Sequence, residues 1–228
     1  MMAQYFADFS GLPDGPLPSS IVRIWDTTDA TTIVGGCLSF RDSGNRRAIA
    51  YIPNAPKTSG VSEMYMRYYS TVAAGTIPML VLRGTVASAA GATGYQALHH
   101  RDNTAFELRR RVGGAESVRF GNFTAPLLAE TVYCMRVRVE TEPTLVRFGA
   151  KVWATNTHEP GDFIALTDTA ANRITSDGLF GFGAMGSSNT SGWVRIAAVG
   201  FGTDGDPAPT DALSPAGRKR HPLLMTPW

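Results

Sequence analysis

The segment from residue 133 to residue 153 limits most strongly what this chain can fold into. Apolar and polar residues alternate along two runs, 133–140 and 146–153, which are separated by a short stretch that contains Pro143. Successive side chains of a β-strand point to opposite faces, so such alternation indicates strands with one buried face each. Two alternating runs joined by a short turn predict an antiparallel hairpin. With the apolar faces of the hairpin on the core, its basic residues point outward together: Arg136, Arg138, Arg147 and Lys151.

Similar patterns predict further strands on both sides of this hairpin. Residues 61–70 alternate in the same way, with Met64, Met66 and Tyr68 on one face and Glu63, Tyr65, Arg67 and Tyr69 on the other. More strands are expected at 77–83, 95–100, 104–111, 117–120, 178–185 and 193–201.

The composition favours β-structure over helices. The 228 residues include 24 Gly and 14 Pro, and only 18% are charged, which argues against a helical bundle or a coiled coil. A short turn of helix near 168–172 is the most that the sequence allows. About a dozen strands without a βαβ rhythm predict an all-β fold, a two-sheet antiparallel sandwich.

The composition and net charge also exclude several classes of protein. A hydrophobic content of 43% argues against disorder, and a net charge of +2 is too small to indicate a nucleic-acid or membrane-surface partner. Cys37 and Cys134 stand in apolar, strand-like runs, where free cysteines behave as small buried hydrophobes. Neither a signal peptide nor a bilayer-spanning run is visible, so we expect a chain made in the cytoplasm and not secreted by the general route.

The end of the chain has a different character. We expect residues 1–202 to form the sandwich and residues 203–228 to form an extended arm, because the arm is rich in proline, then basic, then apolar. The arm has too little apolar surface to fold alone, so we expect it to attach to a neighbouring subunit. The predicted attachment residues are Arg218, Arg220, Leu223, Leu224, Met225 and Trp228.

Several of these motifs together resemble a known family. The strand with Arg136 and Arg138, the run Ala150-Lys151-Val152-Trp153, Glu159-Pro160, Asp168 and the glycine-rich run 178–182 are similar to the C-terminal half of concanavalin A-like (LamG-like) jelly rolls of bacteriophage structural proteins. The opening run 6–11 resembles the first strand of that family. The resemblance implies two antiparallel sheets of six or seven strands, one of them concave.

The resemblance also implies a function. It suggests a virion structural protein of the tail-fibre, baseplate or head-decoration class, assembled in the host cytoplasm. Its partners would be other virion proteins and further copies of itself, a homo-oligomer anchored by the C-terminal arm, with no contact to nucleic acid or membrane. This step from fold to function is an analogy.

Catalytic and metal-binding patterns are weak in this sequence. Some relatives hydrolyse glycans with two carboxylates on one strand, but Glu140 and Glu142 stand at a turn, and Glu107 has no acidic partner two or four residues away. Related jelly rolls often hold calcium through an acid such as Asp8, yet the expected last strand carries no carboxylate. We therefore predict no enzyme, no metal and no cofactor. His99 and His100 are adjacent, so on a strand they point to opposite faces, and we expect surface histidines.

The alternative function is a glycan-binding, lectin-like module that recognises a host surface polysaccharide. Tyr65 and Tyr69 are expected to point outward beside Arg67, and sugars stack on aromatic rings and bond to flanking polar groups. The same tyrosines could instead cover an oligomer contact. Of the 21 basic residues 18 are Arg, and pairs such as Arg46-Arg47 and Arg110-Arg111 could bind phosphate or acidic sugar. Contact with a protein is favoured over contact with nucleic acid.

Overall fold

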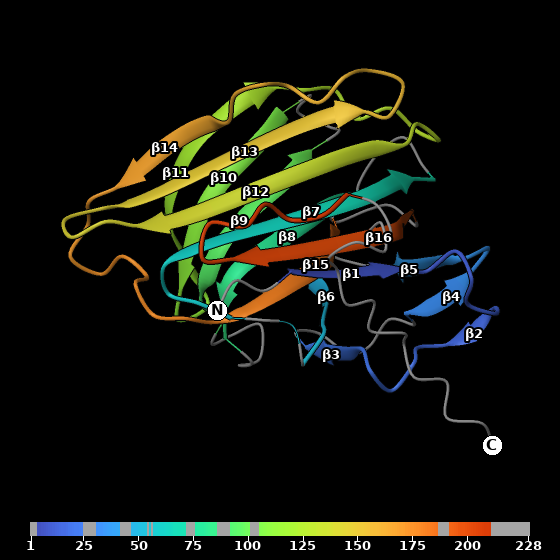
Figure 1. The fold of residues 1–228 in the computed structure, drawn as a ribbon. Helices are drawn as coiled ribbons and strands as arrows, with labels where there is room; N and C mark the ends of the chain where they lie inside the picture. Colours follow the sequence, from blue (N-terminus) through green and yellow to red (C-terminus); the bar gives the residue numbers. More distant parts are fainter. Residues whose placement is uncertain are drawn as a thin grey trace.

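The computed structural model describes most of the chain, and in that part the architecture is β-structure throughout. The described residues are 4–24, 31–41, 47–53, 55, 57–71, 76–85, 92–100, 105–186 and 192–210. They contain sixteen strands and no helix, and residues 171–172, where the sequence allowed a helical turn, form a plain turn. The strands make two sheets packed face to face, so the predicted two-sheet antiparallel jelly-roll sandwich is confirmed (Figure 1).

One sheet contains nine strands, two more than the resemblance implied. The additional strands are short and come from the N-terminal part of the chain. In spatial order the sheet runs β14 (Ile164–Asp168), β13 (Val146–Ala154), β12 (Tyr133–Thr141), β7 (Val61–Ser70), β16 (Trp193–Thr203), β5 (Cys37–Arg41), β4 (Thr32–Val34) and β2 (Gly15–Pro16), and β1 (Gln4–Asp8) pairs with the other half of β16.

The other sheet has the expected seven strands. Its order is β11 (Ala115–Thr124), β10 (Ala105–Val112), β9 (Gly94–His100), β8 (Thr76–Gly84), β15 (Leu179–Gly186), β6 (Arg47–Tyr51) and β3 (Val22–Ile24). All pairings in both sheets are antiparallel, and the predicted hairpin is β12–β13, with Arg136 opposite Lys151.

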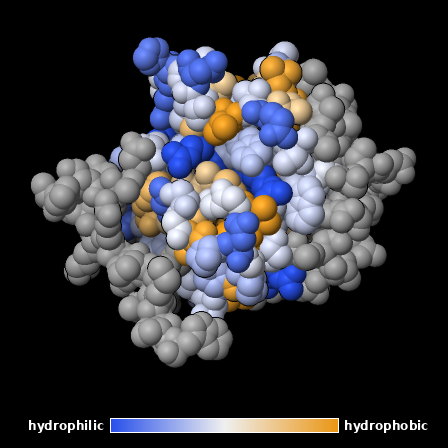
Figure 2. Space-filling view, turned by 90° about the vertical axis from the view of Figure 1, so that its right-hand side faces the viewer, coloured by the Kyte–Doolittle hydropathy of each residue, from blue (hydrophilic) through white to orange (hydrophobic). Residues whose placement is uncertain are grey.

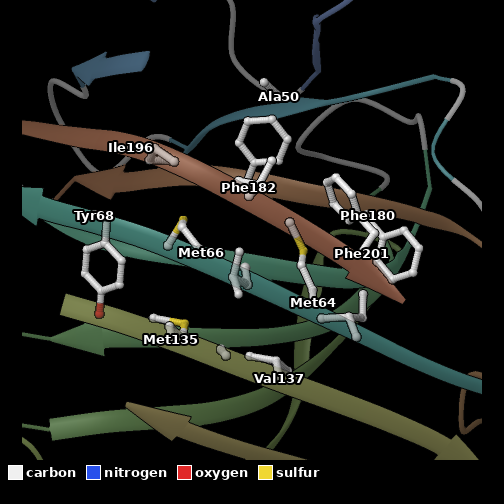
Figure 3. Packing of buried hydrophobic residues seen from close by; sticks show 14 of the residues in the cluster. Ala50, Met64, Met66, Tyr68, Met135, Val137, Phe180, Phe182, Ile196 and Phe201 are labelled. Carbon is white, nitrogen blue, oxygen red and sulfur yellow. The ribbon is translucent and has the colours of Figure 1, made fainter. Parts of the chain in front are cut away.

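The core lies between the two sheets and is built by the alternating strands. Met64, Met66 and Tyr68 of β7 point inward, and Phe180 and Phe182 of β15 point toward them from the other sheet (Figure 3). All five are buried, and each large apolar side chain contributes about 1.5–3 kcal/mol when removed from water. Both cysteines are free and buried, as predicted.

One inward-facing position of β10 is an arginine. Arg110 is 2% exposed and donates from Nη1 to both carboxylate oxygens of Asp168, at 2.8 and 2.6 Å. The Tyr95 hydroxyl donates to the same carboxylate at 2.8 Å, and burial, followed by that hydrogen bond, raises the pKa of Tyr95, so it stays a donor. The hypothesis that the Arg110-Arg111 pair binds a ligand is therefore wrong for Arg110, whose charge is neutralised inside the sandwich.

We expect Asp168→Asn to destabilise the protein by about 3–5 kcal/mol, because it leaves the Arg110 charge buried without a counter-charge. Chemical denaturation measures this, with the exposed Asp162→Asn as the matched control. A loss of unfolding free energy below about 1 kcal/mol in Asp168→Asn would show that the ion pair between Arg110 and Asp168 contributes little to stability.

The adjacent histidines point to opposite faces, but both are buried, so the expectation of surface histidines is wrong. The Tyr68 hydroxyl lies 2.6 Å from His99 Nδ1, and His99 Nε2 lies 2.9 Å from the Ala125 carbonyl oxygen. A carbonyl can only accept, so His99 carries its proton on Nε2 and accepts at Nδ1 from Tyr68. On the other face His100 pairs with Glu107 at 3.1 Å.

The buried His99 makes stability depend on pH in a defined window. Burial lowers the pKa of His99 to about 4, more than its hydrogen bond to Ala125 raises it, whereas an unfolded histidine titrates near 6.5. Stability from this residue is complete above pH ~6.5, and it falls between pH ~6.5 and pH ~4, because only the unfolded state binds the proton there.

We therefore expect the free energy of unfolding to drop by about 3 kcal/mol from this group over that window. Denaturation curves at both pH values should show a smaller drop in His99→Gln than in the unchanged protein. The exposed His158→Gln is the control and should keep the full drop. Identical pH dependence in His99→Gln and the unchanged protein would contradict this account.

The described part of the chain ends on the outer face of the nine-stranded sheet. β16 extends to Thr203, one residue past the expected boundary of the sandwich, and residues 206–210 then return over the same strand. Residues 211–228 lie outside the described residues, so the attachment role of Arg218, Arg220, Leu223, Leu224, Met225 and Trp228 stays a prediction. No helix that could span a membrane occurs among the described residues.

Candidate ligand-binding face

Five bulky side chains gather on the outer face of the nine-stranded sheet, near the ends of its central strands. We call Arg67, Tyr69, Trp153, Trp193 and Arg195 the aromatic–arginine patch; each is partly exposed. Strand pairing brings them together: Tyr69 of β7 lies opposite Arg195 of β16, and Cys134 of β12 lies between Arg67 and Trp153. The Arg195 guanidinium stands 5.6 Å from the centre of the Trp193 ring.

Small side chains form the floor between these bulky ones. Cys134 and Ala198 both lie opposite Arg67 in the strand register, and Ser39 lies opposite Arg195. All three are buried. Among the described residues, the buried Ser39 hydroxyl and the buried Arg195 Nε have no hydrogen-bond partner, so these two polar groups are not used by the described fold.

The electrostatics of the patch are dominated by its two arginines. Burial raises the pKa of the Cys37 thiol, which sits on the same face, while the charges of Arg195 and Arg67 lower it and the more weakly acting Asp8 raises it. Burial also raises the pKa of Tyr69, against a lowering contribution from Arg195. Both arginines therefore act on the same small region.

A cluster of ion pairs borders the patch. Arg136 donates to Glu63 Oε1 at 2.6 Å and to Glu159 Oε1 at 2.8 Å, and Lys151 Nζ lies 2.9 Å from Glu159 Oε1. Burial alone would lower the pKa of Arg136, but its bonds to Glu159 and Glu63 raise it overall. Burial would raise the pKa of Glu159, but Arg136 and Lys151 hold it below its ordinary value.

The residues that return over β16 bind to this cluster through their backbone. We call residues 206–210 the strap. The Ala208 N–H donates to Glu63 Oε1 at 2.9 Å, Arg136 donates to the Ala208 carbonyl at 2.6 Å, and Gln4 Nε2 donates to the Pro207 carbonyl at 2.8 Å. Gly200 and Gly202 allow the close approach, because a Cβ on Gly202 would lie 2.2 Å from the Asp206 carbonyl oxygen.

The strap and the loop that contains Glu159 cover three residues that were predicted to lie on the surface. Tyr65 lies on the predicted face but is only 3% exposed, because it packs in a cluster with Ala208, Cys134 and Trp153. Its hydroxyl lies 3.0 Å from Cys134 Sγ. Arg136 and Lys151 are likewise buried, at 7% and 8% exposure, so the expected outward basic cluster is reduced to Arg138 and Arg147. Of the predicted glycan-binding residues, Arg67 and Tyr69 remain accessible.

We expect Gly202→Ala to displace the strap, since the new methyl group would overlap backbone atoms that cannot rotate away. Overpacking of this kind costs about 1–3 kcal/mol. Limited proteolysis should cut within 206–210 faster than in the unchanged protein. Gly11→Ala is the control, because a Cβ there meets nothing within 4 Å; equal cleavage of the two variants would contradict the proposed close contact.

The carboxylates considered as catalytic candidates are tied into ion pairs. Glu142 pairs with Arg147 at the hairpin end, Glu140 lies 3.8 Å from Arg138, and Glu107 Oε1 lies 2.9 Å from Arg109 Nε. Asp8, considered for calcium, accepts a hydrogen bond from the Ser10 amide at 2.9 Å. Within the described ranges no three His, Cys, Asp or Glu residues come together as a metal site.

Sequence reasoning missed three members of the patch. From the sequence, Trp153 is named only within a motif of the resemblance, and Trp193 and Arg195 only lie within the expected strand 193–201. Their alternation with buried Val194 and Ile196 placed them on the outer face. The missing information was that β16 pairs with β7, which only the folded sheet provides. Figure 2 views the end of the sandwich where β7 ends and β16 begins, and its coloured residues mix hydrophilic and hydrophobic types.

Comparison with solved structures identifies the fold. The carbohydrate-binding module CBM66 from Bacillus subtilis is similar, with a TM-score of 0.54 and 16% identity over 81% of this chain and 96% of that chain. The metal-free lectin I-B4 from Griffonia simplicifolia gives a TM-score of 0.53 and 9% identity over 87% and 98%. A native glycosidic hydrolase gives 0.54 and 11% over 87% and 94%.

These likenesses establish a lectin-like, concanavalin A-like jelly-roll sandwich, and at such low identity they establish the fold alone. No protein-family model and no curated protein matches the sequence. These likenesses do not show a bacteriophage origin.

Proposed function

We propose that this chain is a carbohydrate-binding module that uses the aromatic–arginine patch as its sugar site. The observation that carries the proposal is the grouping of Tyr69, Trp153 and Trp193 with Arg67 and Arg195 over a floor of small side chains. Binding sites of this type combine apolar or aromatic surface with a few placed polar groups. Aromatic rings provide flat apolar contact for a sugar, and guanidinium groups supply several hydrogen-bond donors.

The structural neighbours favour the same class of function. Two of them are named as a carbohydrate-binding module and a lectin, and a third is named as a glycosidic hydrolase. We propose binding without hydrolysis, because the carboxylates of Glu140 and Glu142 are paired with arginines at a turn. The residues that support this proposal include Arg67 and Tyr69 of the sequence-based alternative, with Trp153, Trp193 and Arg195 replacing Tyr65.

The virion structural role stays a second proposal that rests on the sequence resemblance and on residues 211–228 alone. It includes assembly in a host cytoplasm, attachment to virion proteins and formation of a homo-oligomer. The two roles are compatible if the patch binds a host polysaccharide while the arm holds a neighbouring subunit. They separate experimentally, because the patch lies within the described sandwich, whereas the predicted attachment residues lie in 211–228, outside the described residues.

We expect the purified chain to bind oligosaccharides on a glycan array and to release them uncut. Trp193→Ala should weaken binding by about 2 kcal/mol, roughly 30-fold, as for a central aromatic contact. The control is Ile164→Ala, which truncates a partly exposed side chain on edge strand β14. Deleting residues 211–228 should leave binding unchanged; binding lost on deletion and retained in Trp193→Ala would assign recognition to the arm instead.

A further inference from the structure

The charges on the outer face of the nine-stranded sheet are not evenly compensated. Six cationic side chains of β7, β12, β13 and β16 are described on this face. Four of them have carboxylate partners: Arg136 with Glu63 and Glu159, Lys151 with Glu159, Arg138 with Glu140, and Arg147 with Glu142. Within the described chain, Arg67 and Arg195 form no ion pair. They are the two arginines of the patch.

Two like charges on paired strands repel each other. No carboxylate within the described chain pairs with Arg67 or Arg195 to offset this repulsion. Arg67 and Arg195 both project from the β7–β16 pair, and both act on the thiol of Cys37. The nearby acids do not cancel them. Asp8 acts on that thiol less than either arginine does, and Glu130 acts on Tyr69 less than Arg195 does. At these two groups the arginines therefore act more strongly than the nearby acids.

The hydrogen-bonding capacity of the two arginines is also largely unused. In the part of the chain that the structure describes, Arg195 makes one long hydrogen bond, 3.3 Å from Nη1 to the Val34 carbonyl oxygen, and its buried Nε has no partner. The buried hydroxyl of Ser39, which lies opposite Arg195 in the strand register, also has no partner there. Guanidinium groups bind carboxylates and related oxyanions with two parallel hydrogen bonds, and such charge-assisted bonds are the strong ones.

We infer that the patch selects acidic glycans, meaning oligosaccharides that carry carboxylate or sulfate groups. This inference rests on the proposed function, since it names the class of sugar that the same site takes. The aromatic residues Tyr69, Trp153 and Trp193 contact the apolar face of the sugar, and Arg67 and Arg195 bind its anionic group. An acidic group of the sugar supplies the counter-charge that Arg67 and Arg195 lack within the described chain.

The test measures binding of three matched sets of oligosaccharides: neutral, uronate-containing, and sulfated without carboxylate. We expect one or both acidic sets to bind at least about 10-fold more tightly than the neutral set, and this preference should shrink as NaCl rises from about 0.05 M to about 0.5 M. Arg67→Gln and Arg195→Gln should each lower affinity for acidic glycans by about 10-fold or more. Affinity for neutral glycans should change little.

Arg138→Gln is the matched control, because Arg138 lies on the same face and already has Glu140 as its partner. Equal affinity for neutral and acidic sets, unchanged in the Arg67 and Arg195 variants, would overturn the acidic selectivity and leave the proposed function standing. Binding to no set would overturn both. If an oligonucleotide competes as effectively as the acidic glycan does, the patch responds to negative charge alone. That result would also overturn the proposed selectivity for acidic glycans.

Discussion

Two sheets pack face to face through strands whose side chains alternate between the core and the outer surface. Inward side chains of β7 and β15, such as Met66 and Phe182, remove one face of each strand from water (Figure 3). Each buried side chain of this size contributes about 1.5–3 kcal/mol. The outward residues are then fixed in position without contributing to the core, so the outer face is free to carry binding groups. A sandwich of this kind makes a rigid platform, which is what a preorganised site requires.

Polar residues become buried in two different ways in this protein. Arg110 occupies an inward position and is neutralised by Asp168 within the core. Glu63 and Arg136 occupy outward positions and become buried because the strap and the Glu159 loop pack over them. In both cases the cost of removing charge from water is met by close ion pairs and additional hydrogen bonds, as buried charges require. Arg67 and Arg195 on the same face lack such compensation, which separates the patch from its surroundings.

Much of the fold could be predicted from the sequence, because alternation reports directly which face of a strand is buried. The hairpin β12–β13 and the buried set Met64, Met66 and Tyr68 follow from pattern alone. Strand order could not be predicted, since the pairing of β16 with β7 joins residues more than a hundred positions apart. The candidate site was only half predicted for the same reason. Arg67 and Tyr69 belong to one alternating run, whereas Trp193 and Arg195 come from another.

The all-β class, the two-sheet architecture, the hairpin and the faces on which most side chains lie can be predicted from the sequence, because these follow from local periodicity. The accessibility of outward residues and the partners of inward polar residues depend on the tertiary structure. Tyr65 is covered by the strap, His99 is held between Tyr68 and the Ala125 carbonyl, and Arg110 is enclosed with Asp168. Exposure depends on what distant segments pack over a residue, and the alternation of a single strand contains no information about those segments.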